Sequence, residues 1–494
     1  MTESQRLSRR TWGGKPGLGL SGLLVMGACA TNPLTGKSDL AVIPEDQEIE
    51  YGRQGSVEVA ATMGIYDNPA LTAYVDRLGK ALAAKSERPH LPWSFQVADD
   101  PMVNAMALPG GPIFVTRGLL THLSSEAQLV AVLGHEVGHV TGRHAVRQIS
   151  KSMVFVLGNE IGKELWKGWS DVEGLLNPAV GLLMLRYSRD DEREADDLGY
   201  RYTVGNGYEV REAPGVFQMF KQVATADGGE ETPLWLSSHP ESEARADHFA
   251  QRIAETPPPI GIVGRDEFLA ITDGLVYGAD PRQGFFEGGV FKHPRRKFQV
   301  KPPPGWNAMV GERALIATMA EGASGLKLGE NPEGGTPAEA LEKYLAQDGV
   351  TKGEAFTLGA AFPHTGARFT RKDEEGNDTA GAVIFFVHGG ALMKAAFIAT
   401  PDQLATVEAA FRASLATFTT LTEPATLAVE PARLKIVTVA QPMTLAEFAR
   451  QHPAVPAERL SIMNHVGLNA PLTAGQKIKV VEGKLRDDQI KTKS

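Results

Sequence analysis

Residues 134–139 read GHEVGH, and this stretch decides the fold and the chemistry expected of the first half of the chain. His135 and His139 are four residues apart, so on an α-helix both imidazoles leave one face a turn apart and can meet at one metal ion. Glu136 stands beside the first of them, where a carboxylate can take a proton from water held by the metal. Residues 125–133 (SEAQLVAVL) favour a helix, and we expect one long helix over 124–150.

A catalytic zinc site needs a third protein ligand, and its position distinguishes between classes of site. A histidine six residues after His139 would complete one such class, but position 145 is alanine. His144 is nine residues from His135, which is about 180° round a continuous helix. We therefore expect His144 to face away from the metal, as a capping or core residue.

Residues 187–196 (YSRDDEREAD) supply the better candidate. Glu192 and Asp196 are four residues apart and share a helix face, whereas Glu194 points elsewhere. Alone, so charged a stretch would also suit a solvated helix face. Together with GHEVGH it predicts Glu192 as the third ligand and Asp196 as the carboxylate that orients a ligand imidazole. Because imidazoles are poor magnesium ligands, we expect one Zn2+ per chain.

The segments HEVGHVTGRH (135–144) and YSRDDEREAD (187–196) resemble the gluzincin metallopeptidases that include HtpX, the CAAX-prenyl endopeptidases and the periplasmic proteases BepA and LoiP. The resemblance covers roughly residues 30–255 and includes the opening CATNPLTGK. It implies that His135, His139 and Glu192 bind the zinc ion. It also implies that Glu136 is catalytic and that Asp196 supports the metal site.

Two short segments before the active helix also match this family, namely Asn104-Ala105 and Pro109-Gly110-Gly111. Gly110 and Gly111 are expected to turn the chain into a strand over 112–116. That strand could be an edge strand that pairs with an extended substrate backbone, or else an internal strand of the sheet.

Residues 238–245 (SHPESEAR) resemble the His-Pro segment of the family. His239 could cap the open position of the zinc ion in a resting state, donate to a developing oxyanion, or serve only as a turn residue. Arg245 could stabilise the same anion. Charged residues interrupt the apolar stretch 151–178 between the two metal motifs, so we expect it to form a helical lid over the cleft.

Cys29 is the only cysteine, and it follows a basic segment and an apolar stretch over 17–28. This order predicts a signal peptide over 1–28. Gly27-Ala28-Cys29 resembles a lipobox, in which the cysteine becomes lipidated; an ordinary cleaved signal and a buried thiol are the alternatives. Ala30 favours retention in the outer membrane, so we expect a periplasmic protein anchored there by lipid. A single cysteine also excludes an internal disulfide and a thiolate zinc cage.

The chain has 494 residues, of which 42% are hydrophobic, and a formal net charge of −9. Such a length fits about two to four domains. The acidic balance argues against nucleic acid as a partner, since broad nucleic-acid binding needs a basic surface. After residue 40 the sequence has no apolar run of about 18 residues that would cross a membrane.

The pattern along the chain predicts a multidomain α+β protein. A mainly helical zincin protease domain with a small edge sheet is expected first, then an α+β domain of unknown role around an antiparallel sheet, and last a small strand-helix-helix-strand unit. The expected boundaries are 29–45 for a linker, 46–255 for the protease domain, 260–425 for the α+β domain, 430–482 for the last unit and 484–494 for a frayed tail.

Residues 434–482 resemble a LysM module. LysM modules bind N-acetylglucosamine polymers, so the resemblance implies peptidoglycan as a possible partner. Residues 440–443 (AQPM) replace the Pro-Gly-Asp that is usual there. A purely structural or protein-docking role is therefore the alternative.

Taken together, these features imply a zinc endopeptidase of the bacterial cell envelope that acts on misfolded, misassembled or stalled envelope proteins. The competing interpretation is a lipid-anchored scaffold or chaperone-like factor for outer-membrane assembly. Cleavage of peptidoglycan peptides is a third interpretation, and it rests only on the LysM-like end.

Overall fold

The structure is a computed structural model of the chain. It describes residues 29–31, 38–40, 43–158, 187–226, 235, 238–239, 242–311, 314–319, 324–347, 349–359, 362–372, 377–487 and 489–491. The predicted signal peptide (1–28) and most of the predicted lid (151–178) lie outside these residues.

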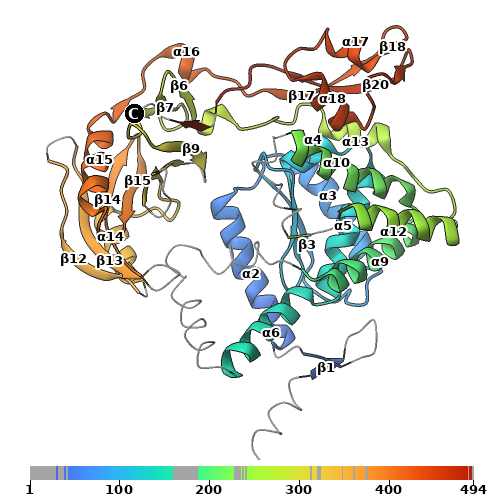
Figure 1. Ribbon diagram of the computed structural model, residues 1–494, viewed down its shortest axis with the longest axis horizontal. Helices are drawn as coiled ribbons and strands as arrows, with labels where there is room; N and C mark the ends of the chain where they lie inside the picture. The colour runs from blue at the N-terminus through green and yellow to red at the C-terminus, as the bar shows by residue number, and fades with distance from the viewer. Residues whose placement is uncertain are drawn as a thin grey trace, which may run out of the picture.

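In its first part the chain packs helices around a three-stranded sheet, as Figure 1 shows. Strand β5 (Pro112–Thr116) is central and pairs in parallel with β3 (Ser94–Ala98) and antiparallel with β4 (Ala105–Ala107). Strands β1 (Cys29–Thr31) and β2 (Ser38–Leu40), which pair antiparallel, precede this part. The helices are α2 (Glu45–Thr62), α3 (Pro69–Ala83), α4 (Arg117–His122), α5 (Glu126–Thr141), α6 (His144–Gly158), α9 (Arg189–Gly205), η2 (Val210–Glu212), α10 (Ala213–Ala226) and α12 (Ser242–Glu255).

Of the two alternatives for residues 112–116, an edge strand and an internal strand, the structure shows the internal strand. Strand β5 has a neighbour on each side, and β4 is the edge strand. Every residue of β5 is buried, as expected for a strand covered on both faces. Strand order depends on which segments pair, and the sequence of β5 alone does not specify its neighbours.

The single helix expected over 124–150 is two helices. α5 ends at Thr141, Arg143 adopts a left-handed φ of 54°, and α6 begins at His144. A left-handed non-glycine residue costs about 1–2 kcal/mol, so the break needs support from elsewhere. Arg143 Nε donates to the buried carboxylate of Glu48 on α2 at 2.9 Å, and its Nη2 donates to the Ile43 carbonyl at 2.7 Å.

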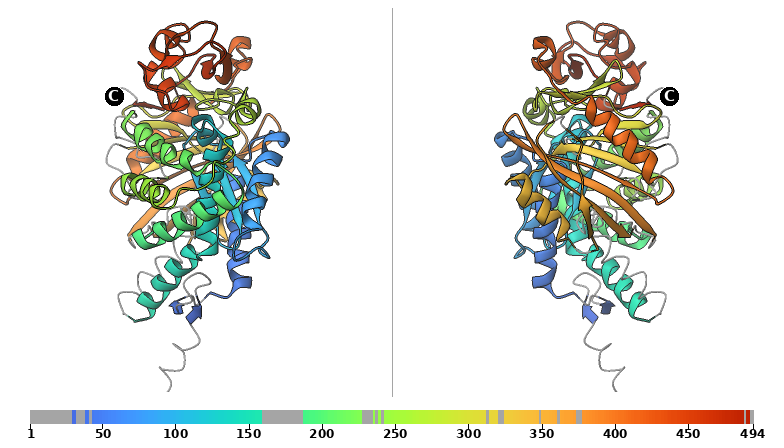
Figure 2. Two further views of the ribbon diagram at one scale, coloured as in Figure 1. Left: turned by 90° about the vertical axis from the view of Figure 1, so that its right-hand side faces the viewer. Right: turned by 90° about the vertical axis from the view of Figure 1, so that its left-hand side faces the viewer.

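The C-terminal unit has the predicted order of strand, helix, helix and strand. Strand β17 (Arg433–Thr438) pairs antiparallel with β20 (Lys477–Glu482), and helices α17 (Leu445–Ala449) and α18 (Ala457–Asn464) lie between them in the chain. Two short strands also pair antiparallel: β18 (Met443–Thr444), directly before α17, and β19 (Pro471–Leu472), after α18. Figure 2 shows this unit as a cap at one end of the molecule, with α6 at the other end.

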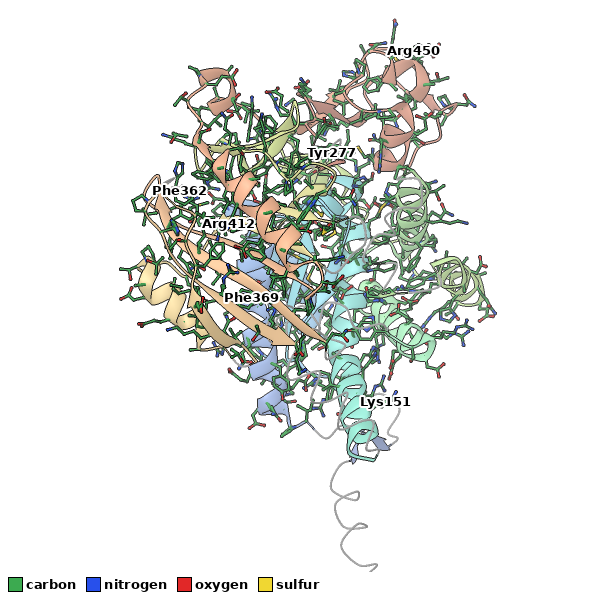
Figure 3. The ribbon with its side chains drawn as sticks, turned by 60° about the vertical axis from the view of Figure 1, so that its left-hand side comes forward. Lys151, Tyr277, Phe362, Phe369, Arg412 and Arg450 are labelled. Atoms are coloured by element: carbon green, nitrogen blue, oxygen red, sulfur yellow. The ribbon has the colours of Figure 1, made fainter. Side chains whose placement is uncertain are left out.

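One hydrophobic core joins the C-terminal unit to the first part of the chain. Leu434, Leu460 and Val480 belong to the same buried cluster as Leu119 of α4 and Val130 of α5. Tyr277, in the connection that follows α13 (Arg265–Thr272), is buried in the same cluster. Figure 3 labels this residue. The unit is therefore packed directly on the segment that leads into the metal helix.

A buried polar cluster strengthens this contact. Lys479 Nζ donates to the carbonyls of Thr121 and Leu123, and burial lowers the pKa of Lys479 well below its ordinary value. Asn464 accepts from the Lys479 amide at 2.8 Å and donates to the Lys479 carbonyl at 2.9 Å. His465 Nε2 donates to the His122 carbonyl at 2.9 Å.

The middle of the chain forms an eight-stranded sheet in the order β12-β13-β14-β15-β11-β10-β9-β21 and a four-stranded sheet in the order β16-β8-β7-β6. Helices α14 and α15 pack on opposite faces of the larger sheet, because Phe385 contacts the cluster of α14 whereas its neighbour Phe386 belongs to the cluster of α15. The elements are η3 (Pro281–Gln283), β6 (Phe285–Glu287), β7 (Val290–His293), β8 (Phe298–Val300), β9 (Asn307–Gly311), β10 (Ala314–Thr318), β11 (Gly325–Glu330), α14 (Pro337–Leu345), β12 (Thr351–Ala355), β13 (Thr365–Lys372), β14 (Asp378–His388), β15 (Ala391–Ala399), α15 (Leu404–Ala416), β16 (Thr419–Thr420) and α16 (Pro424–Leu427).

The expectation of a frayed tail over 484–494 is wrong in part. Strand β21 (Gln489–Lys491) pairs antiparallel with β9 and extends the large sheet. An edge strand with unpaired backbone groups is a template for such pairing, and the tail supplies the partner. Across the described ranges, the helices lack the combination of length and apolar character needed to span a bilayer.

The docked C-terminal unit gives a first prediction. Asn464→Ala leaves the buried amide and carbonyl of Lys479 without partners, at a cost of about 1–3 kcal/mol for each unpaired group. We expect urea unfolding of the full chain to show a stability lower by about 2–4 kcal/mol. Asn469→Ala, at an exposed position of the same unit, is the control. Equal stability of both variants would contradict this role of Asn464.

Candidate metal centre

Helices α5 and α9 bring the predicted ligands together. His135 Nε2 and His139 Nε2 lie 2.9 Å apart on α5. The Glu192 carboxylate of α9 faces both, with Oε1 3.4 Å from His139 Nε2 and Oε2 3.7 Å from His135 Nε2. Their ligand atoms, together with one from His239, all lie within 4.8 Å of one another.

The chemistry of this cluster fits a zinc ion. Within the described part of the chain, Glu192 Oε2 and Glu136 Oε1 are buried atoms without a hydrogen-bond partner. Burial, reinforced by the neighbouring histidines, lowers the pKa of His139 well below its ordinary value, so its imidazole is neutral and keeps a lone pair. Imidazole nitrogens with one carboxylate are donors that zinc prefers.

Small residues allow α9 to come close enough for Glu192 to reach the histidines. A Cβ atom at Gly138 would lie 2.8 Å from the Ala195 carbonyl oxygen, and one at Gly199 would lie 2.9 Å from the His135 amide nitrogen. The backbones of α5 and α9 therefore touch along the metal face. A larger residue at either glycine requires the helices to separate.

Asp196 lies behind the first histidine, as expected. Its Oδ1 is 2.9 Å from His135 Nδ1, which leaves Nε2 of that ring directed at the cluster. Burial alone would raise the pKa of Asp196, but Arg245 and His135 outweigh it and hold the pKa well below its ordinary value. Likewise, His239 and Arg245 outweigh burial and lower the pKa of Glu192.

Comparison with known proteins agrees with this geometry. Residues 69–253 match the sequence profile of Peptidase family M48. These residues form an M48 peptidase domain. The resemblance based on HEVGHVTGRH and YSRDDEREAD is thereby confirmed, and the M48 domain is a zinc metallopeptidase domain.

The M48 domain has relatives in organelles and in bacteria. Mitochondrial metalloendopeptidase OMA1 of Arabidopsis thaliana is 35% identical over 173 residues, which are 35% of this chain and 34% of that protein. Beta-barrel assembly-enhancing protease of Yersinia pestis is 26% identical over 258 residues, 50% of this chain and 52% of that protein. The chain thus spans about a third to a half of the length of these curated relatives.

Among solved structures, LpqN of Mycobacterium tuberculosis, involved in cell envelope biogenesis, matches with a TM-score of 0.19 at 16% identity. The match covers 25% of this chain and 83% of LpqN. So low a score assigns neither fold nor function.

His239 joins the cluster from outside the two ligand helices. Its Nδ1 lies 2.8 Å from Glu192 Oε1 and 3.3 Å from His135 Nε2. The ring stacks on Trp235 with 4.9 Å between centroids, and Trp235 stacks on Phe220 at 4.0 Å. His239 is therefore held among the ligands by aromatic packing and is more than a turn residue.

Arg245 contacts two carboxylates at the metal centre, those of Asp196 and Glu192. Its Nε and Nη2 donate to the two oxygens of Asp196 at 2.8 and 2.7 Å. Nη1 lies 2.8 Å from Glu192 Oε2, although neither atom forms an aligned hydrogen bond. The guanidinium also lies 4.7 Å from the ring centroids of both Phe217 and Trp235, so its position is fixed by charge and by packing.

His144 is a buried core residue outside the ligand cluster, as expected, but it contacts the ligand His139. Because the chain breaks at Arg143, His144 does not follow the rotation of α5, and its Nδ1 lies 2.8 Å from His139 Nδ1. Glu194 points away from the ligand cluster, as expected, and its Oε2 lies 3.1 Å from His144 Nε2. Gly142, two residues before His144, was the available sign of a helix end, since glycine commonly ends helices.

Asn104, Gly110 and Gly111 belong to the hairpin beside the cluster. Gly110 and Gly111 have φ of 74° and 125°, and a Cβ at Gly110 would lie 2.5 Å from Ile49 Cα on α2. The turn from β4 to β5 therefore explains why glycine occupies positions 110 and 111. Asn104 precedes edge strand β4, and Cys29, whose lipidation stays a prediction, opens β1.

The close contact of α5 and α9 gives a second prediction. Gly138→Ala forces the helices apart, so we expect a stability loss of about 1–3 kcal/mol and zinc binding weakened by about tenfold or more, because ligand distances must hold within about 0.2 Å. Chelator competition with the purified chain measures the affinity. Gly205→Ala, at the open end of α9, is the matched control. Wild-type affinity in Gly138→Ala would show that the close contact is dispensable.

Proposed function

We propose that the chain is a zinc-dependent endopeptidase of the bacterial cell envelope that hydrolyses misfolded or stalled envelope proteins. The observation that carries the proposal is the convergence of His135, His139 and Glu192, with an unpartnered Glu136 oxygen beside them. These are the parts that hydrolysis of a peptide bond requires: a place for one metal ion and a free carboxylate.

When bound by these three side chains, zinc supplies a Lewis acid that polarises the scissile carbonyl and acidifies the attacking water. Glu136 acts as general base and takes a proton from that water at Oε1. The same carboxyl group then returns the proton to the nitrogen of the leaving amine. Oε1 is buried and accepts no hydrogen bond, with His239 Nε2 3.9 Å away, so it is available for both transfers.

The residues around the ligands have distinct roles in this proposal. Asp196 holds the His135 ring through Nδ1, and Arg245 holds Asp196. Arg245 therefore acts through Asp196 and Glu192. Its contacts favour this supporting role over direct stabilisation of the oxyanion. His239 covers the metal position in the resting state, since its Nδ1 lies 2.8 Å from Glu192.

We further propose that the substrate binds as an added strand on β4. This strand is at the edge of its sheet, where an extended peptide can make main-chain hydrogen bonds. A small cavity next to it is lined by Ala107, Leu108, His139 and Tyr187, among others. A substrate side chain in that cavity would lie beside a metal ligand. Edge strand β4 thus takes over the part assigned to residues 112–116 from the sequence.

The envelope location rests on two observations. The N-terminal sequence before Cys29 has the pattern of a lipoprotein signal. Relatives in Vibrio cholerae and Yersinia pestis are named beta-barrel assembly-enhancing protease, putatively so in the first. We infer a periplasmic enzyme anchored to the outer membrane, whose substrates are misassembled envelope proteins. The C-terminal unit packs on the core of the first part of the chain, which favours a structural role over the peptidoglycan binding that its LysM resemblance implies.

A third prediction tests the base. Glu136→Gln keeps the size and position of the side chain but cannot accept the proton, so casein degradation should fall by about 10²–10⁴-fold. Zinc content should stay at one ion per chain. Glu255→Gln, an exposed glutamate of α12, is the control. If Glu136→Gln degrades casein as fast as wild type, the assignment of the base is wrong. If the wild type degrades nothing yet captures envelope proteins, the scaffold interpretation gains.

A fourth prediction tests the anchor. Cys29→Ala removes the only thiol that can be acylated. We expect the wild-type protein to sediment with outer membranes and the variant to be absent from them, as a soluble periplasmic or unprocessed form. Labelling with radioactive palmitate should mark the wild type alone. Equal labelling of both proteins would contradict lipidation at this residue.

A further inference from the structure

Each ligand histidine has a second ring nitrogen, and the two are supported in different ways. His135 Nδ1 faces a carboxylate directly, with Asp196 Oδ1 at 2.9 Å. His139 Nδ1 faces another imidazole, with His144 Nδ1 at 2.8 Å. The His144 ring is fully buried and stands nearly perpendicular to that of His139, at 89°.

Zinc binding through His139 Nε2 determines where the protons of the two imidazoles lie. A ring that offers a lone pair at Nε2 carries its proton on Nδ1. His139 directs Nε2 at the ligand cluster, so its Nδ1–H donates to His144 Nδ1. The His144 proton is then on Nε2, where it donates to Glu194 Oε2 at 3.1 Å. Each hydrogen bond requires the next, and the chain ends on a carboxylate.

Arg147 completes the arrangement. Its Nη2 donates to Glu194 Oε2 and to Asp191 Oδ1, both at 2.7 Å. His144, Asp191 and Glu194 lie close enough to hold an ion of their own. A guanidinium between the two carboxylates already supplies the positive charge, which argues against a second metal there. It also holds the Glu194 carboxylate in place to accept from His144.

We propose that His144 and Glu194 are positioning residues that set the tautomer and ring orientation of His139 for zinc binding. They do for His139, through an intervening imidazole, what Asp196 does for His135. An arginine stands behind each carboxylate, Arg147 in one case and Arg245 in the other. The inference rests on the proposed zinc site but concerns neither the substrate nor the base.

The test measures zinc affinity of the purified full chain by competition with a chromophoric chelator, using zinc alone as probe. Loss of such supporting contacts typically weakens metal binding by about 10–100-fold. We expect this loss in His144→Leu and in Glu194→Gln. In His144→Asn the side-chain oxygen can still accept from His139 Nδ1, so the loss should be smaller than in His144→Leu. Asp190→Asn, an exposed carboxylate one turn earlier on α9, is the control.

Two further measurements separate positioning from folding. The double variant His144→Leu/Glu194→Gln should bind zinc about as weakly as His144→Leu, because Glu194 reaches His139 only through His144. The visible spectrum of the cobalt-loaded protein should change in both single variants and stay the same in Asp190→Asn. Glu194→Gln preserves side-chain shape and keeps the test valid if His144→Leu folds poorly.

The inference is overturned if Glu194→Gln and a folded His144 variant bind zinc within twofold of wild type. It is also overturned if the two losses simply add. Either result leaves the proposed function intact, provided that Glu136→Gln binds zinc and lacks peptidase activity. A wild-type chain that binds no zinc removes both.

Discussion

The contact between α5 and α9 is the constraint on which the rest of the structure depends. Gly138 and Gly199 let the two backbones touch, and only then does Glu192 reach the Nε2 atoms of His135 and His139. The other elements maintain this contact. The three-stranded sheet lies against one side of α5, and the C-terminal unit is packed against the turn that leads into it.

Buried charge around the metal centre is neutralised in pairs. Asp196 is matched by Arg245, Glu194 by Arg147, and Glu48 by Arg88 and Arg143. Asp196 and Arg245 are both buried, so removing either leaves an uncompensated buried charge, at a cost of about 3–5 kcal/mol. The contact of Glu48 with Arg143 also holds Arg143 in its left-handed conformation, and the helix break there turns His144 towards His139. A contact more than ninety residues away in sequence thus shapes the surroundings of a ligand.

Local spacing was enough to predict the centre of the site. Two histidines four apart, and Glu192 four before Asp196, are governed by helix periodicity, so sequence alone indicates which side chains share a face. The positions of His144 and of β5 were not accessible in this way. One depends on Glu48 of a distant helix, the other on the choice of neighbours in a sheet. The return of residues 489–491 to β9 likewise depends on an edge that exists only in the folded chain.

The most direct measurement is a crystal structure of the zinc-loaded chain with anomalous data collected at the zinc absorption edge. We expect one strong peak per chain, with His135 Nε2, His139 Nε2 and a Glu192 oxygen at about 2.0–2.2 Å from it. A peak between His144, Asp191 and Glu194, or no peak within reach of all three predicted ligands, would contradict this assignment of the zinc site.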